Sequence, residues 1–192
     1  MDKLRIGILG LGRGITHLKN FLSLPEVEVI GACDRFPLLR ERAQEHIAAA
    51  DASTPVLNEF NELLALRPDA IMVATNGKLQ VEHACQALNA GCHVLSEVPG
   101  AYTQQECMRL RETVEYTGKT YMLAENTCYW DFFRYFRKWV AADRFGPISI
   151  AEGEYIHHLP ATLMRPDGSR LSPTTARAAG HRDATPIWRA IW

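Results

Sequence analysis

IGILGLGRG, residues 6–14, is a short apolar run that closely spaced glycines interrupt. Its apolar part is typical of a strand that is buried on both faces of a parallel sheet. Gly10, Gly12 and Gly14 then predict a turn into a helix, where backbone N–H groups and the helix N-terminus can bind a pyrophosphate. Strict GxGxxG spacing needs a glycine where this chain has Ile15, and Gly14 comes one residue early. A tight turn that merely connects strand and helix is therefore the alternative.

A second signal lies about twenty residues beyond the glycine turn. Residues 27–33 are an apolar run that predicts another strand, and Asp34 follows it directly. A carboxylate at this place accepts hydrogen bonds from both hydroxyls of an adenosine ribose and repels a ribose 2′-phosphate, which favours NAD over NADP. Arg35 could instead pair with such a phosphate or stack on adenine. The alternative role of Asp34 is a helix or turn cap ahead of Pro37.

The rest of residues 1–125 alternates between strand and helix patterns. Apolar runs predict strands at residues 4–9, 27–33, 69–75, 93–97 and 121–124, with a brief extended piece at 54–57. Apolar residues at helical spacing or cap signals predict helices at residues 15–24, 37–50, 60–66, 81–90 and 103–118, the last with a capping box of Thr103 and Glu106. Parallel strands need right-handed crossovers, so the alternation predicts an α/β fold with a doubly wound parallel Rossmann sheet.

The chain changes character after residue 125. Residues 130–142 predict an aromatic-rich helix, and residues 148–157 alternate apolar and polar residues as a strand with one solvent-facing side does. Residues 159–192 are rich in Pro, Arg, Gly and Thr without clear periodicity. Because a single strand cannot make a domain, we predict that residues 126–192 are the truncated start of an α+β substrate and oligomerisation domain.

Composition excludes several classes of partner. The chain has 21 basic and 22 acidic residues without a run of like charge, which argues against nucleic acid or membrane and favours small molecules. The five cysteines have neither CxxC spacing nor the density of a disulfide scaffold, and no apolar signal segment precedes the first strand. We therefore expect reduced cysteines and a cytoplasmic location.

Several short motifs occur in one order along residues 4–158. They are the glycine turn, DAIMVAT at 69–75, EHA at 82–84, AGCHVLSEVP at 90–99, AEN at 124–126, FGPI at 145–148 and EGEY at 152–155. In this order the chain resembles the Gfo/Idh/MocA oxidoreductases. The resemblance implies a second α/β domain whose large open sheet covers a nicotinamide, and the oxidation or reduction of sugars, inositols and related alcohols. It also implies an oligomer with a small, carbohydrate-like substrate.

The resemblance extends to the residues of a cofactor site. It implies that Ala74, Thr75 and Asn76 line the dinucleotide and that Glu97 and Asn126 lie near the nicotinamide ribose or ring. Asn76 departs from the family's usual proline. With the glycine turn and the second strand, the predicted NAD site consists of Gly10, Leu11, Gly12, Arg13, Gly14, Asp34, Arg35, Ala74, Thr75, Asn76, Glu97 and Asn126.

Val98 is the largest departure from the family, whose usual triplet is Glu-Lys-Pro with a lysine that approaches the reacting hydroxyl. A valine has no proton to exchange, so another residue or water would take that role. We predict Glu97 and His157 as the catalytic residues. Strand alternation allows only one of His157 and His158 to face a cleft, and ordinary hydrogen bonding or solvent exposure is the alternative. These adjacent histidines form no recognisable metal motif.

Three functions remain open from the sequence. The leading prediction is a nicotinamide-dependent oxidoreductase that transfers hydride to or from a sugar, polyol or related substrate. The segments SEVPGA at 96–101 and MLAEN at 122–126 resemble a divergent branch that includes NAD-using glycosidases, in which oxidation, elimination, water addition and reduction occur in one turnover. The other alternative is a catalytically silent module that binds NAD(H) or a metabolite. His17 is assigned no chemistry, because packing within its helix explains it as well.

Overall fold

Six parallel strands form one sheet in the order β3-β2-β1-β4-β5-β6. The computed structural model describes residues 2–152 of the chain. The strands are β1 (Leu4–Leu9), β2 (Val27–Cys33), β3 (Val56–Leu57), β4 (Ala70–Val73), β5 (His93–Ser96) and β6 (Tyr121–Leu123). The order runs outward from β1 in one direction and from β4 in the other, so the topological switch point lies between these two strands.

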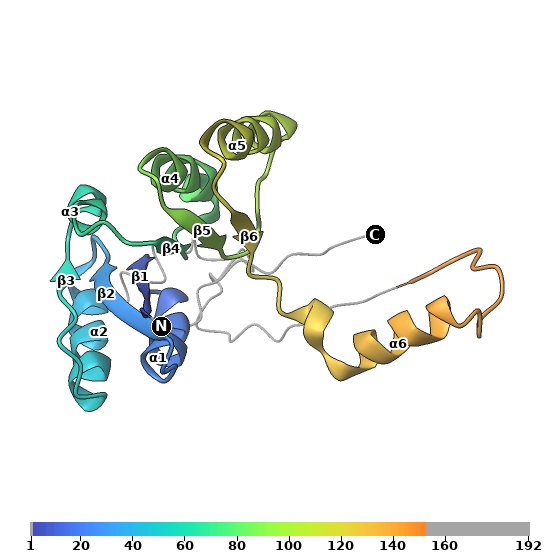
Figure 1. The fold of residues 1–192 in the computed structure, drawn as a ribbon, viewed down its shortest axis with the longest axis horizontal. Coiled ribbons are helices and arrows are strands. Elements are labelled where there is room, and N and C mark those ends of the chain that lie inside the picture. The colour runs from blue at the N-terminus through green and yellow to red at the C-terminus, as the bar shows by residue number, and fades with distance from the viewer. Residues whose placement is uncertain (1, 153–192) are drawn as a thin grey trace, which may run out of the picture.

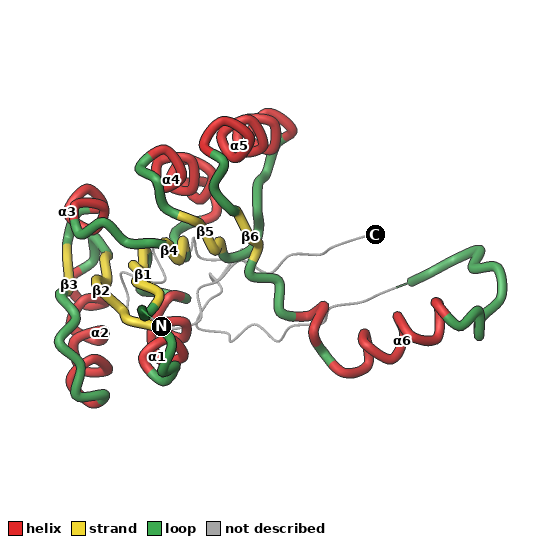
Figure 2. Tube along the Cα trace, viewed as in Figure 1, coloured by secondary structure: helices red, strands yellow, loops and turns green. Residues whose placement is uncertain are grey.

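Helices cover both faces of the sheet, as Figures 1 and 2 show. One face carries α1 (Gly14–Leu22) and α2 (Pro37–Ala49), and the other carries α3 (Phe60–Ala65), α4 (Gly77–Asn89) and α5 (Gln104–Thr117). The buried apolar residues form two clusters, one with Leu18 and Leu39 from α1 and α2, the other with Leu63, Leu88 and Leu110 from α3, α4 and α5. The predicted doubly wound parallel sheet is therefore confirmed.

Local signals explain where the helices begin and end. In α5, Thr103 Oγ1 accepts the Glu106 N–H at 3.1 Å and the Glu106 carboxylate accepts the Thr103 N–H at 3.0 Å, which confirms the capping box. The helix ends at Gly118 in the left-handed conformation, with φ of 62°. Helix α4 begins at Gly77, four residues before the predicted start, because the Asn76 side chain accepts the Lys78 N–H and caps it there.

The chain leaves the sheet after β6. A single 3₁₀ turn, η1 (Thr127–Tyr129), leads into α6 (Asp131–Ala141), which projects away from the sheet and its helices in Figure 1. Every residue of α6 is exposed. Residues 148–152 are not in a strand, so that part of the predicted strand at 148–157 is wrong; no strand of the described residues lies beside it to form a ladder. The rest of that prediction lies outside the described residues.

Candidate functional site

The turns after β1 and β4 touch through their backbones at the switch point. Gly10 has φ of 90°, and its N–H donates to the Cys33 carbonyl at 2.8 Å. A Cβ on Gly10 would lie 2.6 Å from the Ala74 carbonyl oxygen and 2.8 Å from the Thr75 nitrogen. A side chain is excluded there both by the left-handed conformation and by contact with backbone that has no room to move. The glycine therefore permits the close approach of the two turns.

The N-terminus of α1 lies beside this contact and has no side-chain cap. Arg13 occupies the N-cap position without capping through its side chain, and the first turn of α1 holds no acidic residue. In contrast, α3, α4 and α5 are capped by Glu59, Asn76 and Thr103, whereas α2 and α6 lack a side-chain cap as α1 does. The first N–H groups of a helix lack partners within it and carry partial positive charge. The residues present thus fit the pyrophosphate of a dinucleotide.

Gly14 lets α1 pack closely on the sheet. A Cβ at this position would lie 3.2 Å from Ile8 Cγ2 and 3.3 Å from Ala74 Cβ. Leu11 is buried and Gly12 is half-buried, so the glycine turn is held against the sheet. The glycine turn therefore has the packing role of a strand-to-helix connection as well as the shape of an anion site.

Asp34 is buried at the end of β2 and already accepts two hydrogen bonds. Its Oδ2 accepts the Leu11 N–H at 2.7 Å and its Oδ1 accepts the Phe36 N–H at 2.9 Å. The second bond is the local turn cap that the sequence offered as an alternative. Each carboxylate oxygen has a further lone pair, so the geometry leaves acceptors for ribose hydroxyls. Arg35 beside it is exposed and stacks on Phe36, with its Cζ 4.8 Å from the ring centroid.

Thr75 follows β4 and bonds to α4. Its Oγ1 lies 3.0 Å from His83 Nδ1, and burial lowers the pKa of His83, which favours the neutral imidazole. The Gln80 Nε2 donates to the Thr75 carbonyl at 3.5 Å, whereas its buried Oε1 has no hydrogen-bond partner within residues 2–152. The Asn76 side chain is occupied by its helix-capping bond. Ala74, the third predicted residue of this turn, lies against Gly10 through its backbone.

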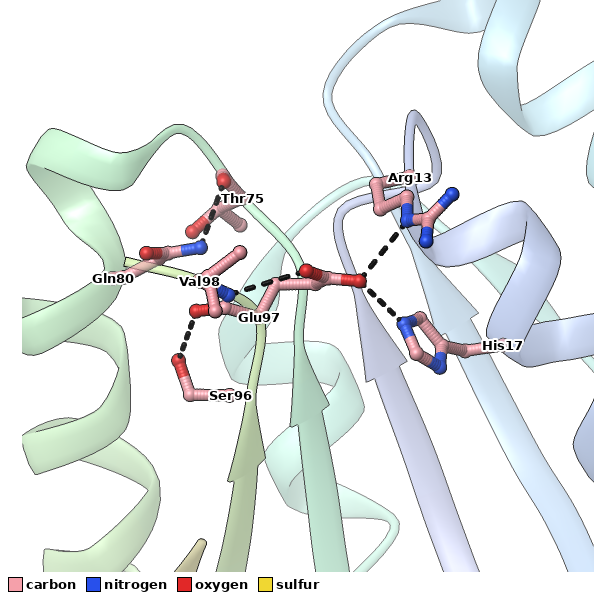
Figure 3. A network of polar contacts seen from close by, with 7 residues as sticks. All are labelled: Arg13, His17, Thr75, Gln80, Ser96, Glu97 and Val98. Atoms are coloured by element: carbon pink, nitrogen blue, oxygen red, sulfur yellow. Dashed lines mark hydrogen bonds and ion pairs between the residues drawn. The ribbon is translucent and has the colours of Figure 1, made fainter. Parts of the chain in front are cut away.

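Glu97 connects the loop after β5 to the glycine turn (Figure 3). Its Oε1 lies 3.1 Å from Arg13 Nε and 2.7 Å from His17 Nε2, and its Oε2 accepts the Val98 N–H at 3.2 Å. Burial alone would raise the pKa of Glu97, but the hydrogen bond and charge of His17 and the charge of Arg13 outweigh it and lower the pKa. Glu97 is therefore an ionised, buried carboxylate at neutral pH.

The remaining predicted residues are less closely connected. Val98 is half-buried beside Glu97, and Asn126 is exposed in the segment that follows β6. His157 lies outside the described residues. No group of three His, Cys, Asp or Glu side chains within residues 2–152 is arranged to hold a metal ion. None of the helices in this part of the chain is long and apolar enough to span a membrane.

Sequence reasoning missed two histidines that contact the site. His17 bonds to Glu97, and His83 bonds to Thr75 and packs edge-on against Phe60 with ring centroids 5.6 Å apart. His17 lies in the first turns of α1, directly after the glycine turn, and this position was the available signal. Its partner is 80 residues away in the sequence, which no local pattern reveals.

The chain is similar to a known protein family and to curated relatives. The family described as "Oxidoreductase family, NAD-binding Rossmann fold", Gfo/Idh/MocA, matches residues 4–125. A "Glycosyl hydrolase family 109 protein" of Shewanella baltica is 31% identical over 199 aligned positions, which cover 100% of this chain and 40% of that protein. An "Alpha-N-acetylgalactosaminidase" of Shewanella oneidensis is 31% identical over 83% of this chain and 36% of that protein. The chain thus spans about 40% of the length of these curated relatives.

Solved structures share the fold. Scyllo-inositol dehydrogenase from Lactobacillus casei, bound to NAD(H) and scyllo-inositol, has a TM-score of 0.68 and 22% identity over 76% of this chain and 43% of its own. The WlbA dehydrogenase from Bordetella pertussis, in complex with NADH and UDP-GlcNAcA, has a TM-score of 0.67 and 24% identity over 76% of this chain and 44% of its own.

The family match covers the segment that carries the glycine turn, Asp34 and Glu97. It confirms the resemblance found in the sequence, the Rossmann sheet and the nicotinamide type of cofactor. With the sheet order, the uncapped N-terminus of α1 and the family match in agreement, the chain belongs to the Gfo/Idh/MocA oxidoreductase family with its NAD-binding Rossmann fold.

Proposed function

We propose that this protein binds NAD and transfers hydride between the cofactor and a hydroxyl-bearing carbon of a sugar, polyol or related substrate. The observation that carries the proposal is the uncapped N-terminus of α1, held beside Ala74 by the Gly10 contact at the switch point of the sheet. Family membership supports the reaction class. Solved proteins of the same fold that were crystallised with NAD(H) and an inositol or a UDP-sugar support the substrate class.

The cofactor site in this proposal follows the carboxyl ends of the strands. The backbone of residues 10–14 binds the pyrophosphate, and Asp34 accepts the adenosine ribose hydroxyls with Arg35 over the adenine. Residues 74–76 line the middle of the dinucleotide. Glu97 and Asn126 lie toward the nicotinamide. A carboxylate at Asp34 favours NAD over NADP, because it repels a 2′-phosphate.

Proton transfer must accompany hydride transfer in this reaction. NAD supplies the hydride acceptor when it is bound. The substrate hydroxyl loses its proton as its carbon loses hydride, and Val98 has no group that can take the proton. We propose His157 as the group that takes it, because a neutral imidazole is a suitable base near neutral pH. His157→Gln should abolish turnover while leaving NAD affinity unchanged.

A screen for hydride transfer tests the proposed function. NAD with a panel of sugars, inositols and polyols should develop the absorbance of reduced nicotinamide, and NADH with the matching ketones should lose it. Asp34→Ala serves as the cofactor-deficient control. Binding of NAD without any change in absorbance across the panel would contradict hydride transfer to or from a free substrate and favour the silent binding module.

A specific observation favours a second candidate, an NAD-using glycosidase. The lysine of the family's triplet is replaced by Val98, and the curated relatives with 31% identity carry glycosidase names. In this candidate the hydride returns to the substrate within one turnover, so no net NADH accumulates. Release of nitrophenol from a nitrophenyl N-acetylgalactosaminide, dependent on NAD but without reduced nicotinamide at the end, would select the glycosidase over the dehydrogenase.

We also propose that residues 126–192 begin a second, substrate-binding domain, which the departure of α6 from the sheet domain supports. The exposed aromatic face of α6 supports self-association into a homo-oligomer. The five unpaired cysteines support a reducing, cytoplasmic location.

A further inference from the structure

Three N–H groups from two separate segments converge on the buried carboxylate of Glu97. They belong to Arg13 and His17, at the start of α1, and to the backbone of Val98. An ionised carboxylate only accepts hydrogen bonds, so the Nε2 atom of His17 carries the proton in this contact. Arg13 and His17 lie 84 and 80 residues before Glu97 in the sequence. The contact therefore joins parts of the chain that are distant in sequence.

This contact crosses the carboxyl end of β4. Strand β4 lies between β1 and β5 in the sheet, and Figure 3 shows the Glu97 side chain reaching from the end of β5 across β4 to Arg13 and His17. The turn after β1 is also in backbone contact with the turn after β4 at Gly10. The glycine turn is thus held from two directions at the switch point, where dinucleotides bind in open α/β sheets.

We propose that Glu97 is a positioning residue, which forms a clamp with Arg13 and His17 that holds the glycine turn in the shape that binds the cofactor pyrophosphate. It does not itself exchange a proton with the substrate. This inference rests on the proposed function, gives His17 a role that the sequence left open, and replaces the catalytic role predicted for Glu97.

The charges of the clamp support a positioning role for Glu97 rather than a role in proton transfer. The Arg13 guanidinium faces the Glu97 carboxylate, so its charge is compensated within the protein, and the phosphates are left to the backbone N–H groups of α1. A carboxylate that two cationic or hydrogen-bonding side chains stabilise in its ionised form is a poor proton acceptor. The clamp thus fixes the geometry of the glycine turn, and the same contacts make the Glu97 carboxylate a weaker base.

Replacement of His17 tests the clamp on the 192-residue chain. Calorimetric titrations use NAD and ADP-ribose, because ADP-ribose carries the pyrophosphate but no nicotinamide. His17→Leu should weaken both ligands in parallel by about tenfold, the scale of one lost charged hydrogen bond. His17→Gln, whose amide N–H reaches Glu97, should restore both affinities to within about twofold. Asn20→Leu, at an exposed position of the same helix, is the matched control and should leave them unchanged.

A double-mutant test distinguishes a positioning role of His17 through Glu97 from direct contact of His17 with the cofactor. In a Glu97→Leu chain, His17→Leu should change either affinity by less than about twofold, because leucine leaves no acceptor for the His17 N–H. Equal effects of His17→Leu in the two backgrounds would overturn the clamp. So would weakening of NAD alone, which would mean that the pair acts at the nicotinamide.

A shorter amide at position 17 and the binding of the wild-type chain complete the test. If His17→Leu does not fold, His17→Asn replaces it: its side chain is too short to reach Glu97, so it should bind about tenfold more weakly than His17→Gln. Equal affinities of the Asn and Gln variants would overturn the clamp. A wild-type chain that binds neither NAD nor ADP-ribose would overturn the proposed function itself, whereas normal wild-type binding with unchanged affinities in the His17 variants would overturn only the clamp.

Discussion

Asp34 combines a local structural role with the proposed ribose contact. Its oxygens hold the Leu11 and Phe36 N–H groups, which fixes the carboxylate at the end of β2 before any ligand arrives. A side chain that is already oriented loses little conformational entropy on binding. Because of these two bonds, a substitution at Asp34 affects the turn as well as the ligand. Its test therefore needs a control that also loses a bond to a backbone N–H.

Asp34→Ala should weaken NAD by about 1–3 kcal/mol, because charged hydrogen bonds to the ribose are lost, and should weaken NADP less. Isothermal calorimetry measures both affinities. Asp69→Ala is the matched control: Asp69 also accepts a backbone N–H, from Arg5 at 2.8 Å, but it precedes β4 at the opposite edge of the sheet. Unchanged NAD affinity in Asp34→Ala would place the ribose elsewhere.

Glu97 predicts how stability depends on pH. Its pKa in the folded chain is lowered by the hydrogen bond to His17 and the charges of His17 and Arg13, which outweigh desolvation. A folded-state pKa below the unfolded one gives stabilisation that is complete above the unfolded pKa and is lost as the pH falls through the folded pKa.

Below about pH 4, the wild-type free energy of unfolding should therefore fall more steeply than that of Glu97→Gln. Urea titrations at a series of pH values measure the two curves. Glu115→Gln removes a carboxylate of an exposed surface pair with Arg111 and should leave the slope as in wild type. Parallel curves for wild type and Glu97→Gln would contradict the ionised, clamped carboxylate.

At the scale of elements, the turns after β1 and β4 form one unit through Gly10. Gly10→Ala places a Cβ against backbone atoms of the other turn and forces alanine into a left-handed conformation. The substitution should therefore lower the free energy of unfolding by about 2–4 kcal/mol. Gly91 is a matched control, because it has φ of 87° and nothing within 4 Å of its would-be Cβ. Gly91→Ala should cost only about 1 kcal/mol. Equal losses in urea unfolding would mean that the contact between the turns contributes nothing.

The elements of the sheet domain were predictable because each carries its own local signal. Strands of a parallel sheet are continuous apolar runs, and the Thr103 capping box and Gly118 mark both ends of α5. The pattern of apolar residues predicts the start of α4 four residues too late, because Asn76 caps the helix ahead of that pattern. The predicted strand at 148–157 failed over residues 148–152, since alternation alone supplies no partner strand.

The site was predictable only in part. Short motifs mark the glycine turn, Asp34 and Glu97, and these residues follow the carboxyl ends of β1, β2 and β5 in the structure. The partners of Glu97 were not found, since Arg13 and His17 meet it only after three strands have assembled. Motifs thus identify the residues of a site, whereas their roles depend on long-range contacts.

At the scale of the whole molecule, α6 carries an apolar surface that the sheet domain does not cover. Phe132, Phe136 and Trp139 share one face of the helix and remain 42–48% exposed. Large contiguous apolar patches on a protein surface favour association.

The 192-residue chain should therefore self-associate, and light scattering should give a mass above that of one chain. Phe136→Asp combined with Trp139→Asp should yield a monomer with the melting temperature of the sheet domain unchanged, because α6 lies apart from it. Tyr116→Asp, at an 88% exposed position of α5, is the control and should leave the mass unaltered. A wild-type chain that stays monomeric at high concentration would contradict association through α6.

The Glu97 contact also has a consequence for the order of folding. It joins Glu97 to residues 80 and 84 positions earlier in the chain, and only once β1, β4 and β5 lie side by side, so we expect it to form late in folding. Interactions that are absent from the transition state slow unfolding without speeding refolding. Loss of the clamp should therefore raise the unfolding rate while the refolding rate stays the same.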